Sequence, residues 1–175
     1  MKLLKPVCIL GMPASGKSYF AEALALHWEV PCIHLDQVIE RAEGRSIEQI
    51  WDRYQESAFR SLERYYLMHQ LIQKPVVMSL GGGTAAHFDN MFLIQNLSFS
   101  IWLKVGLSVL EQRILEKPRP LFQNLDEIMP KLEALMNFRY QYYERASLVV
   151  ELNNDEPKTL TNVTTYCQRQ NIISE

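Results

Sequence analysis

The chain has 175 residues, a length that fits one domain, and 47% of its residues are hydrophobic, so we expect it to fold around a core of its own. Its 18 basic and 20 acidic side chains leave a formal net charge of −2 at pH 7, which gives no general electrostatic reason to bind nucleic acid or an anionic membrane surface. Three widely spaced cysteines, Cys8, Cys32 and Cys167, predict neither a disulfide framework nor a zinc site and are typical of a reducing cytoplasm. We therefore expect a cytoplasmic protein of one domain, a monomer, with a discrete site for a small ligand.

The first ten residues imitate a secretory signal, because a basic start is followed by an apolar stretch. Lys5 and Pro6 interrupt that stretch, and cleavage near Ala14 would cut through the most informative motif of the chain. No other part approaches the roughly 18 uninterrupted apolar residues that a membrane-spanning helix needs. We expect neither a signal peptide nor a membrane span.

Short apolar runs alternate with helical patterns along the whole chain. Apolar runs bounded by glycine or proline predict five strands, at residues 6–10, 30–35, 75–80, 99–105 and 147–152. Apolar spacings of three to four residues predict helices at 17–28, 46–73, 87–95, 107–115 and 125–145, with a last helix near the C-terminus. Because this alternation requires right-handed crossovers, it predicts an α/β fold in which a five-stranded parallel sheet has helices on both faces.

Five of the seven glycines come directly after predicted strands. Gly11 and Gly16 lie in one short loop, and Gly81, Gly82 and Gly83 lie together in another. In an open parallel sheet these positions lie at the carboxyl ends of the strands, where ligands bind. The glycines therefore predict the place of a ligand site.

The first glycine loop carries a phosphate-binding motif. GMPASGKS, residues 11–18, matches G-x-x-x-x-G-K-[ST] between a predicted strand and a predicted helix. Backbone N–H groups in such a loop point at phosphate oxygens, and the following helix N-terminus adds partial positive charge. We expect Lys17 to bridge the β- and γ-phosphates of ATP and the Ser18 hydroxyl to bind Mg²⁺. The predicted nucleotide-binding residues here are Gly11, Ala14, Ser15, Gly16, Lys17, Ser18 and Tyr19.

Three features are candidates for the second substrate, and each has a structural alternative. Asp36 follows the second strand, where it either faces the phosphate loop or caps the next helix. Arg60 lies in a predicted helix as either a solvated arginine or an anion ligand, and Glu63 one turn later either holds Arg60 or forms an ordinary exposed pair. Three adjacent glycines, residues 81–83, are better explained by a ligand close to the backbone than by a plain turn.

Several separate stretches together resemble the shikimate kinase family over nearly the whole chain. They are GMPASGKS, LDQVIERAEGRSIEQIW, ESAFRSLE, SLGGG, RPLF and LMNFRYQYYERA. The resemblance implies a nucleoside-monophosphate-kinase-like P-loop fold with a short lid at about 113–125 and a substrate-binding helical region at about 36–65. It also implies ATP-dependent phosphorylation of the shikimate 3-hydroxyl, giving shikimate 3-phosphate and ADP, in chorismate and aromatic amino-acid biosynthesis.

The resemblance also implies roles for individual residues. Asp36 would bind the shikimate hydroxyls and assist deprotonation of the attacking one, with Lys17 and Arg119 as the other catalytic residues. Arg60 and Arg139 would pair with the shikimate carboxylate, which suits planar guanidinium groups, and Gly81, Gly82 and Gly83 would line the pocket. Arg119 matches a lid arginine that reaches over the phosphates. Arg113 resembles the arginine that packs on adenine.

The sequence departs from the family pattern at two positions. His34 stands where relatives commonly have an aspartate that supports Mg²⁺, so either Mg²⁺ binds more weakly and is reached only indirectly, or His34 simply packs or caps. Ala14 replaces a glycine common in the phosphate loop. Two alternative functions stay open: a kinase for another small hydroxy acid such as gluconate, and a nucleotide-binding regulatory protein without catalysis.

Overall fold

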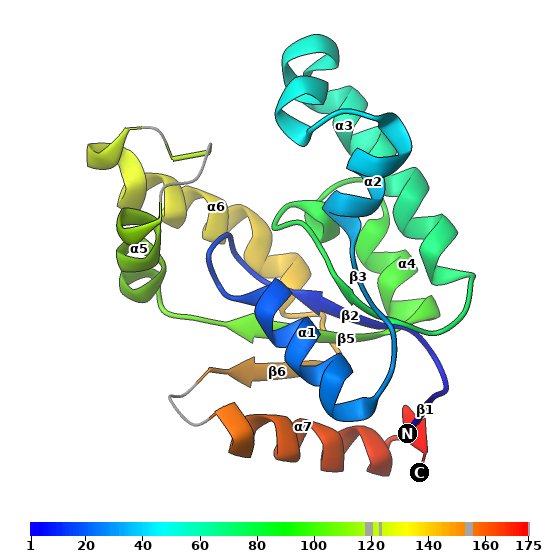
Figure 1. The fold of residues 1–175 in the computed structure, drawn as a ribbon. Coiled ribbons are helices and arrows are strands. Elements are labelled where there is room, and N and C mark those ends of the chain that lie inside the picture. Colours follow the sequence, from blue (N-terminus) through cyan, green and yellow to red (C-terminus); the bar gives the residue numbers. More distant parts are fainter. Residues whose placement is uncertain (118–120, 123, 153–155, 175) are drawn as a thin grey trace.

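A computed structural model describes residues 1–117, 121–122, 124–152 and 156–174 (Figure 1). Its strands are β1 (Lys2–Leu3), β2 (Val7–Leu10), β3 (Cys32–His34), β4 (Val77–Ser79), β5 (Phe99–Lys104), β6 (Leu148–Glu151) and β7 (Ile173–Ser174). Its α-helices are α1 (Lys17–Trp28), α2 (Leu35–Glu43), α3 (Ile47–Leu71), α4 (Asn90–Leu97), α5 (Leu107–Glu116), α6 (Ile128–Tyr143) and α7 (Glu156–Arg169). Short 3₁₀ turns span Thr84–Ala86 and Leu125–Glu127.

The centre of the fold is a parallel sheet with the strand order β3-β4-β2-β5-β6. Val7 in the middle strand pairs with Val77 on one side and with Phe99 on the other. All four residues of β2 are buried, as a strand covered on both faces requires. The prediction of an α/β fold with a five-stranded parallel sheet is confirmed.

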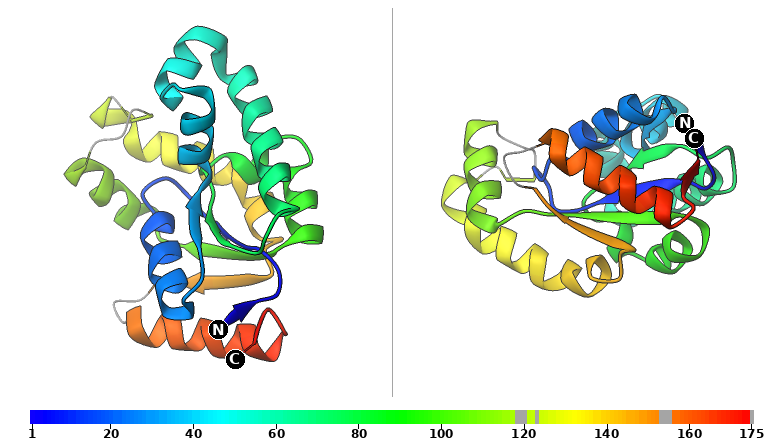
Figure 2. Two further views of the ribbon diagram at one scale, coloured as in Figure 1. Left: turned by 45° about the vertical axis from the view of Figure 1, so that its right-hand side comes forward. Right: turned by 90° about the horizontal axis from the view of Figure 1, so that it is seen from below.

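Helices cover both faces of this sheet, and the two faces make two separate cores (Figure 2). Side chains along β2 alternate between them, with Ile9 on one face and Cys8 on the other. Helices α1 and α7 pack on the face of Ile9, where Trp28 is fully buried. Helices α2 to α6 supply the apolar side chains of the opposite core, so all but two of the described helices lie on that side.

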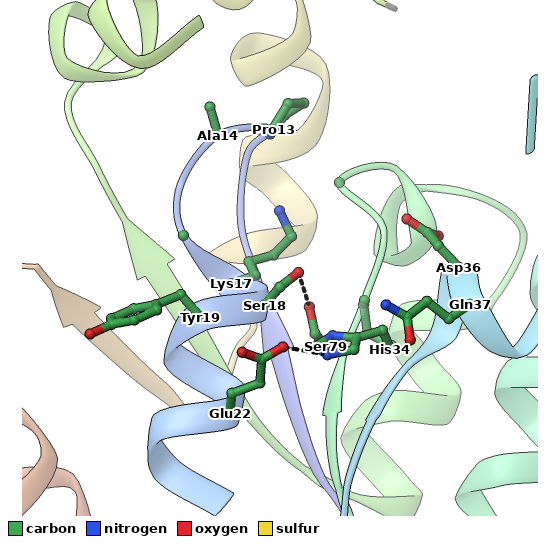
Figure 3. Close-up of a pocket in the computed structure, with 13 residues that line it drawn as sticks. Pro13, Ala14, Lys17, Ser18, Tyr19, Glu22, His34, Asp36, Gln37 and Ser79 are labelled. Atoms are coloured by element: carbon green, nitrogen blue, oxygen red, sulfur yellow. Dashed lines mark hydrogen bonds and ion pairs between the residues drawn. The ribbon is translucent and has the colours of Figure 1, made fainter. Parts of the chain in front are cut away.

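Helix α2 was not predicted as a separate element, and it changes how Asp36 is interpreted. The residue at the N-cap of α2 is His34, while Asp36 lies inside the first turn. The interpretation of Asp36 as the helix cap is therefore wrong. The start of α2 places Asp36 in the lining of the pocket next to the phosphate loop (Figure 3).

The other predicted helices are present with small shifts. Helix α3 begins after a capping box in which the Ser46 hydroxyl accepts from the backbone N–H of Gln49 at 3.2 Å and the Gln49 side chain accepts from the Ser46 N–H. A kink interrupts α3 at Gln55, whose φ of 65° and ψ of 170° are not helical. Helices α4 and α6 begin three residues later than predicted, because 3₁₀ turns or bends precede them.

The two ends of the chain meet in a small antiparallel pair that the sequence did not predict. Leu3 in β1 pairs with Ile173 in β7, and both side chains are buried in the core under α1 and α7. Strands of two residues are too short to show an alternating pattern. Within the parts of the chain that the structure describes, none of the helices is both long and apolar enough to cross a bilayer.

Candidate functional site

The phosphate loop connects the end of β2 to the start of α1. Gly16 immediately precedes the helix with a φ of 90°, a left-handed conformation that glycine adopts without strain. Lys17 is buried, and its ammonium group donates to the carbonyl oxygen of Met12 at 2.8 Å across the loop. Ser18 turns toward the end of β4, where its hydroxyl lies 3.4 Å from that of Ser79 (Figure 3). The predicted strand, loop and helix therefore form one continuous cradle.

A pocket of about 480 Å³ opens beside this loop. Its lining combines the cation of Lys17 with two carboxylates, Glu22 and Asp36, and with the hydroxyls of Ser18 and Ser79. These groups come from α1, from the start of α2 and from the end of β4, which are neighbours at the carboxyl edge of the sheet (Figure 3). The pocket therefore lies where an open parallel sheet places its ligands.

His34 faces the same pocket and is paired with an acid. Its Nε2 lies 2.9 Å from Oε1 of Glu22, which is one turn after Ser18 on α1. Nδ1 of His34 is buried and has no hydrogen-bond partner among the described residues. His34 is the N-cap residue of α2 but makes no side-chain cap bond there, so its main contact is with Glu22. Sequence reasoning missed Glu22, because nothing in the helical pattern distinguishes it from a solvated acid.

Asp36 has an altered proton affinity. Desolvation by the surrounding protein raises the pKa of its carboxyl above the ordinary value of 3.8, and the nearby charge of Glu63 raises the pKa further. The positive charges of Lys17 and Arg60 act in the opposite direction. A carboxylate with a raised pKa is a better proton acceptor than an ordinary aspartate.

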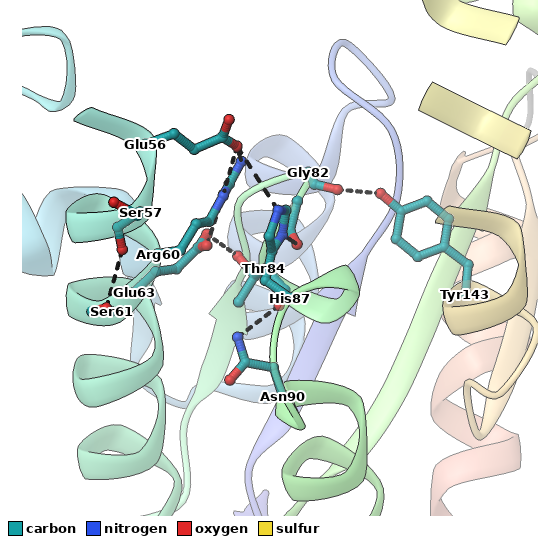
Figure 4. Close-up of polar contacts among 11 residues, drawn as sticks. Glu56, Ser57, Arg60, Ser61, Glu63, Gly82, Thr84, His87, Asn90 and Tyr143 are labelled. Atoms are coloured by element: carbon teal, nitrogen blue, oxygen red, sulfur yellow. Dashed lines mark hydrogen bonds and ion pairs between the residues drawn. The ribbon is translucent and has the colours of Figure 1, made fainter. Parts of the chain in front are cut away.

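Arg60 is held between two carboxylates on its own helix (Figure 4). Its Nη1 donates to Oε2 of Glu63 at 2.8 Å, and Glu63 is fully buried and also accepts from the hydroxyl of Thr84. Its Nε and Nη2 both donate to Oε1 of Glu56, at 3.1 and 2.9 Å. Arg60 is only 8% exposed, so it is not a solvated arginine, and Glu63 is not an ordinary exposed helix pair.

The glycine triplet brings these side chains together. A Cβ atom on Gly83 would lie 2.8 Å from Nη2 of Arg60, and one on Gly82 would lie 3.1 Å from Nη1 of Arg139. A Cβ atom on Gly81 would lie 3.1 Å from Oδ1 of Asp36. The close approach that the three glycines permit is thus made by the protein's own side chains. Only Gly82 of the three lines the pocket beside the phosphate loop.

Arg139 differs from Arg60 in how its guanidinium is used. It projects from α6 and is 5% exposed, yet its Nε and Nη1 have no hydrogen-bond partner among the described residues. Buried guanidinium N–H groups without a partner are costly, and an anion placed against them removes the cost. All three guanidinium nitrogens of Arg60 thus bond carboxylates, whereas two of Arg139 have no partner among the residues that the structure describes, and the two arginines lie against adjacent glycines of the same turn.

Tyr143 is a site residue that the sequence did not reveal. Its hydroxyl bonds to the carbonyl oxygen of Gly82 (Figure 4) and lies 3.0 Å from that of Gly11, so it joins the phosphate loop to the glycine triplet. Burial raises the pKa of Tyr143 to about 12, so the hydroxyl stays protonated. The ring of Tyr143 also packs against Trp102, and no sequence pattern indicates where its hydroxyl lies.

Three further predicted residues lie around the nucleotide side. Nη1 of Arg113, on α5, donates to the carbonyl oxygen of Ala14 at 3.2 Å, so it packs on the outside of the phosphate loop. Ala14 itself has a φ of 62°, in the left-handed region that favours glycine. Tyr19 lines the pocket and is largely exposed. Arg119 lies outside the described residues, as do other positions of the predicted lid.

Comparisons with known proteins identify the family of the whole chain. A family model described as shikimate kinase matches residues 13–170. The shikimate kinase of Bartonella henselae is 33% identical over 159 residues, which are 89% of this chain and 74% of the relative. The shikimate kinase of Clostridium botulinum is 31% identical over 166 residues, which are 93% of this chain and 96% of the relative.

The similarity extends to solved structures. The structure of shikimate kinase from Acinetobacter baumannii in complex with shikimate is similar with a TM-score of 0.86 and 25% sequence identity, and the match covers 98% of this chain and 96% of that chain. The family match, the identities and the P-loop kinase fold all extend over most of the sequence. This chain belongs to the shikimate kinase family.

Proposed function

We propose that this protein transfers the γ-phosphoryl group of ATP to the 3-hydroxyl of shikimate, giving shikimate 3-phosphate and ADP. The observation that carries the proposal is the convergence of Asp36, Arg60 and Arg139 on one glycine turn beside the phosphate loop. A small acceptor with a carboxylate and vicinal hydroxyls is the chemistry that such a set recognises. The relatives named above carry the same activity in their names.

On the nucleotide side, the phosphate loop positions ATP. Its backbone N–H groups and the N-terminus of α1 bind the phosphates, and Lys17 leaves the carbonyl of Met12 to bridge the β- and γ-phosphates. Arg113, already against the loop at Ala14, closes the adenine side. Positioning and charge neutralisation supply most of the rate enhancement in phosphoryl transfer.

The residues present fit Mg²⁺ carried by the nucleotide. Mg²⁺ binds oxygen ligands and usually uses one or two carboxylates together with waters and substrate phosphates. The pocket offers the hydroxyls of Ser18 and Ser79 and the carboxylate of Glu22, which His34 holds in place. When bound, Mg²⁺ neutralises charge that develops on the phosphate oxygens.

We expect His34→Asp to lower the Mg²⁺ concentration for half-maximal activity and to strengthen Mg²⁺-dependent ADP binding measured by calorimetry. An unchanged Mg²⁺ requirement would rule out an effect of His34 on the metal.

On the acceptor side, Arg60 and Arg139 bind the carboxylate and Asp36 prepares the hydroxyl. Glu63 fixes the guanidinium of Arg60. Nε and Nη1 of Arg139, which have no partner among the described residues, donate to the carboxylate of the acceptor. Asp36 accepts a hydrogen bond from the attacking hydroxyl and takes its proton as the bond to phosphorus forms. Its raised pKa favours this transfer.

Further parts of the proposal concern the whole chain. We propose that residues from about 36 to 65 form the substrate-binding region and that a lid from about 113 to 125 closes with Arg119 over the phosphates. A lid of this kind excludes water and protects ATP from hydrolysis. We also propose that the enzyme works as a cytoplasmic monomer.

A coupled assay of ADP formation tests the function directly. With ATP and Mg²⁺ we expect turnover of shikimate and none of gluconate or nucleoside monophosphates. Arg139→Ala should raise the KM for shikimate by about 10- to 150-fold, the range that 1.5–3 kcal/mol per charge-assisted hydrogen bond gives, and should leave the KM for ATP nearly unchanged. Arg145→Ala, an exposed arginine just after α6, is the matched control. Turnover of gluconate in place of shikimate, or of neither, would refute the assignment.

A further inference from the structure

The three guanidinium nitrogens of Arg60 all donate to carboxylates, and the two carboxylates differ in solvent exposure. Glu63, which takes Nη1, has a side chain that is 0% exposed, and it is held a second time by Thr84. Glu56, which takes Nε and Nη2, has a side chain that is 52% exposed. The carboxylate of Glu63 is thus fixed in the protein interior, whereas that of Glu56 can separate from Arg60 and become solvated.

Glu56 also stands at a position in the helix that favours movement. It is the first residue after the kink at Gln55, so it begins the second straight part of α3 (Figure 4). A single oxygen, Oε1, makes both bonds to Arg60 and lies 3.8 Å from Nε2 of His87. When it leaves Arg60, the carboxylate has solvent and the imidazole of His87 as its surroundings.

The two arginines of the glycine turn are therefore in different states. Nε and Nη1 of Arg139 are buried and have no partner among the described residues, whereas Nε and Nη2 of Arg60 bond an acid of the protein. A carboxylate that enters beside Gly82 and Gly83 meets Arg139 directly, but it reaches the Nε–Nη2 edge of Arg60 only after Glu56 has moved.

We propose that Glu56 is a displaceable stand-in for the acceptor's carboxylate, which occupies Arg60 until the acceptor binds. The inference rests on the proposed function, because it concerns the same acceptor site. Glu56 keeps a nearly buried cation satisfied while the site is free of substrate. The apparent affinity for an acceptor with a carboxylate is the intrinsic affinity multiplied by the fraction of time that Glu56 is away from Arg60.

The stand-in also contributes to specificity. An acceptor without a carboxylate gives Arg60 nothing in return for Glu56, so the glutamate remains in place and the compound binds without that contact. An acceptor with a carboxylate exchanges one ion pair for another and adds the bonds of Arg139. Glu56 therefore keeps the hydroxyls of neutral polyols from the Nε–Nη2 edge of Arg60, and it lowers the affinity for the correct substrate.

The test removes the charge of Glu56 and keeps its shape. Calorimetric titration of shikimate into Glu56→Gln, without nucleotide, should give a dissociation constant about three- to tenfold lower than that of the unaltered protein, since a partly exposed ion pair of this type contributes about 1 kcal/mol. The KM for shikimate should fall with it, and kcat should stay within about twofold. Asp52→Asn is the matched control, because it removes the same charge from α3 one turn earlier, at an exposed residue that is not a partner of Arg60.

The opposite result identifies a positioning role. If Glu56 serves only to orient Arg60, Glu56→Gln weakens shikimate binding and the inference is wrong; an unchanged dissociation constant overturns it as well. Glu56→Ala gives a second measurement in which no side-chain oxygen remains to bond Arg60, and a thermal unfolding scan of each variant confirms folding. Failure of the unaltered protein to bind or phosphorylate shikimate would count against the proposed function itself, which separates the two outcomes.

Discussion

Among single residues, Asp36 has the environment that most alters its chemistry. Desolvation and the charge of Glu63 raise the pKa of its carboxyl, and Lys17 and Arg60 hold it back. A group with a raised pKa loses its charge at a higher pH than the same group in an unfolded chain. Both activity and stability should report this difference.

The first prediction concerns catalysis by Asp36. Asp36→Asn should lower kcat by about 10²- to 10⁴-fold, because the variant cannot accept the proton of the attacking hydroxyl. In the unaltered enzyme, kcat/KM should fall on the acid side at a pH above the ordinary carboxyl pKa of 3.8. Steady-state rates over a pH series measure both effects, and a variant with full activity would remove Asp36 from the mechanism.

The same substitution should stabilise the folded protein at neutral pH. Because folding raises the pKa of Asp36, the ionised form is unfavourable in the folded state, and this cost is present above the folded pKa and absent below 3.8. Asp36→Asn should therefore raise Tm at neutral pH, and the gain should shrink as the pH falls toward 3.8. Gln37→Glu, at the next pocket residue, should not reproduce the gain.

Tyr143 is the second residue with a specific expectation. Tyr143→Phe removes the hydroxyl that bonds the carbonyl oxygens of Gly11 and Gly82, so it should lower the free energy of unfolding by about 1–3 kcal/mol. It should also raise KM for both ATP and shikimate, because it loosens both glycine turns. Tyr140→Phe is the control, since Tyr140 lies on the same helix and is 47% exposed. Equal behaviour of the two variants in denaturant unfolding and kinetics would contradict the role of the hydroxyl.

At the scale of elements, α3 combines good local signals with one strained position. The apolar spacing predicts a helix over residues 46–73, and α3 spans Ile47–Leu71 after the capping box at Ser46. Gln55 carries no such signal, yet its φ of 65° and ψ of 170° are a conformation that is almost confined to glycine. Helix α3 packs against α2, and no local sequence pattern contains information about such packing or about the kink.

The kink gives a prediction with an unusual sign. Glycine inside a helix normally costs about 0.5–1 kcal/mol relative to alanine, but at Gln55 it relieves backbone strain of about 1–3 kcal/mol. Gln55→Gly should therefore raise the free energy of unfolding in urea, whereas Ser61→Gly, at an exposed regular position of the same helix, should lower it. A loss of stability in both variants would show that the strain at Gln55 is absent.

On the scale of the whole molecule, the sheet separates two hydrophobic cores that support different parts of the structure. The core on the side of α2 to α6 supports the elements that carry Asp36, Arg60 and Arg139, and the core under α1 and α7 contains the paired chain ends. Stability and activity should respond separately to changes in the second core.

Leu3 tests this separation. Leu3→Ala should lower the free energy of unfolding by about 2 kcal/mol, because it removes buried methyl groups from the core under α1 and α7. The kcat and KM values below the unfolding transition should remain within about twofold of those of the unaltered protein. A large change in KM with little change in unfolding would connect the chain ends to the site.

The sequence predicted the parts of this molecule that depend on short-range patterns. The five parallel strands follow from apolar runs, and the phosphate loop follows from a motif between a strand and a helix. The missed features need information from distant residues: the β1–β7 pair joins opposite ends of the chain, Tyr143 bonds two loops, and Glu22 pairs with His34 across two elements. The resemblance to a family named Arg60 and Arg139 together, and the structure adds that all three nitrogens of Arg60 bond carboxylates, whereas two of Arg139 have no partner within the described parts of the chain.

The hydroxyl of Tyr143 has a consequence for how the two substrates bind. A single phenol group contacts the turn that cradles ATP and the turn that borders the acceptor, so a ligand that orders one turn leaves less disorder for the other to lose. Thermodynamic linkage then makes the effect reciprocal: the factor by which nucleotide tightens shikimate equals the factor by which shikimate tightens nucleotide. The hydroxyl oxygen of Tyr143 is therefore the atom through which we expect the binding of one substrate to affect the binding of the other.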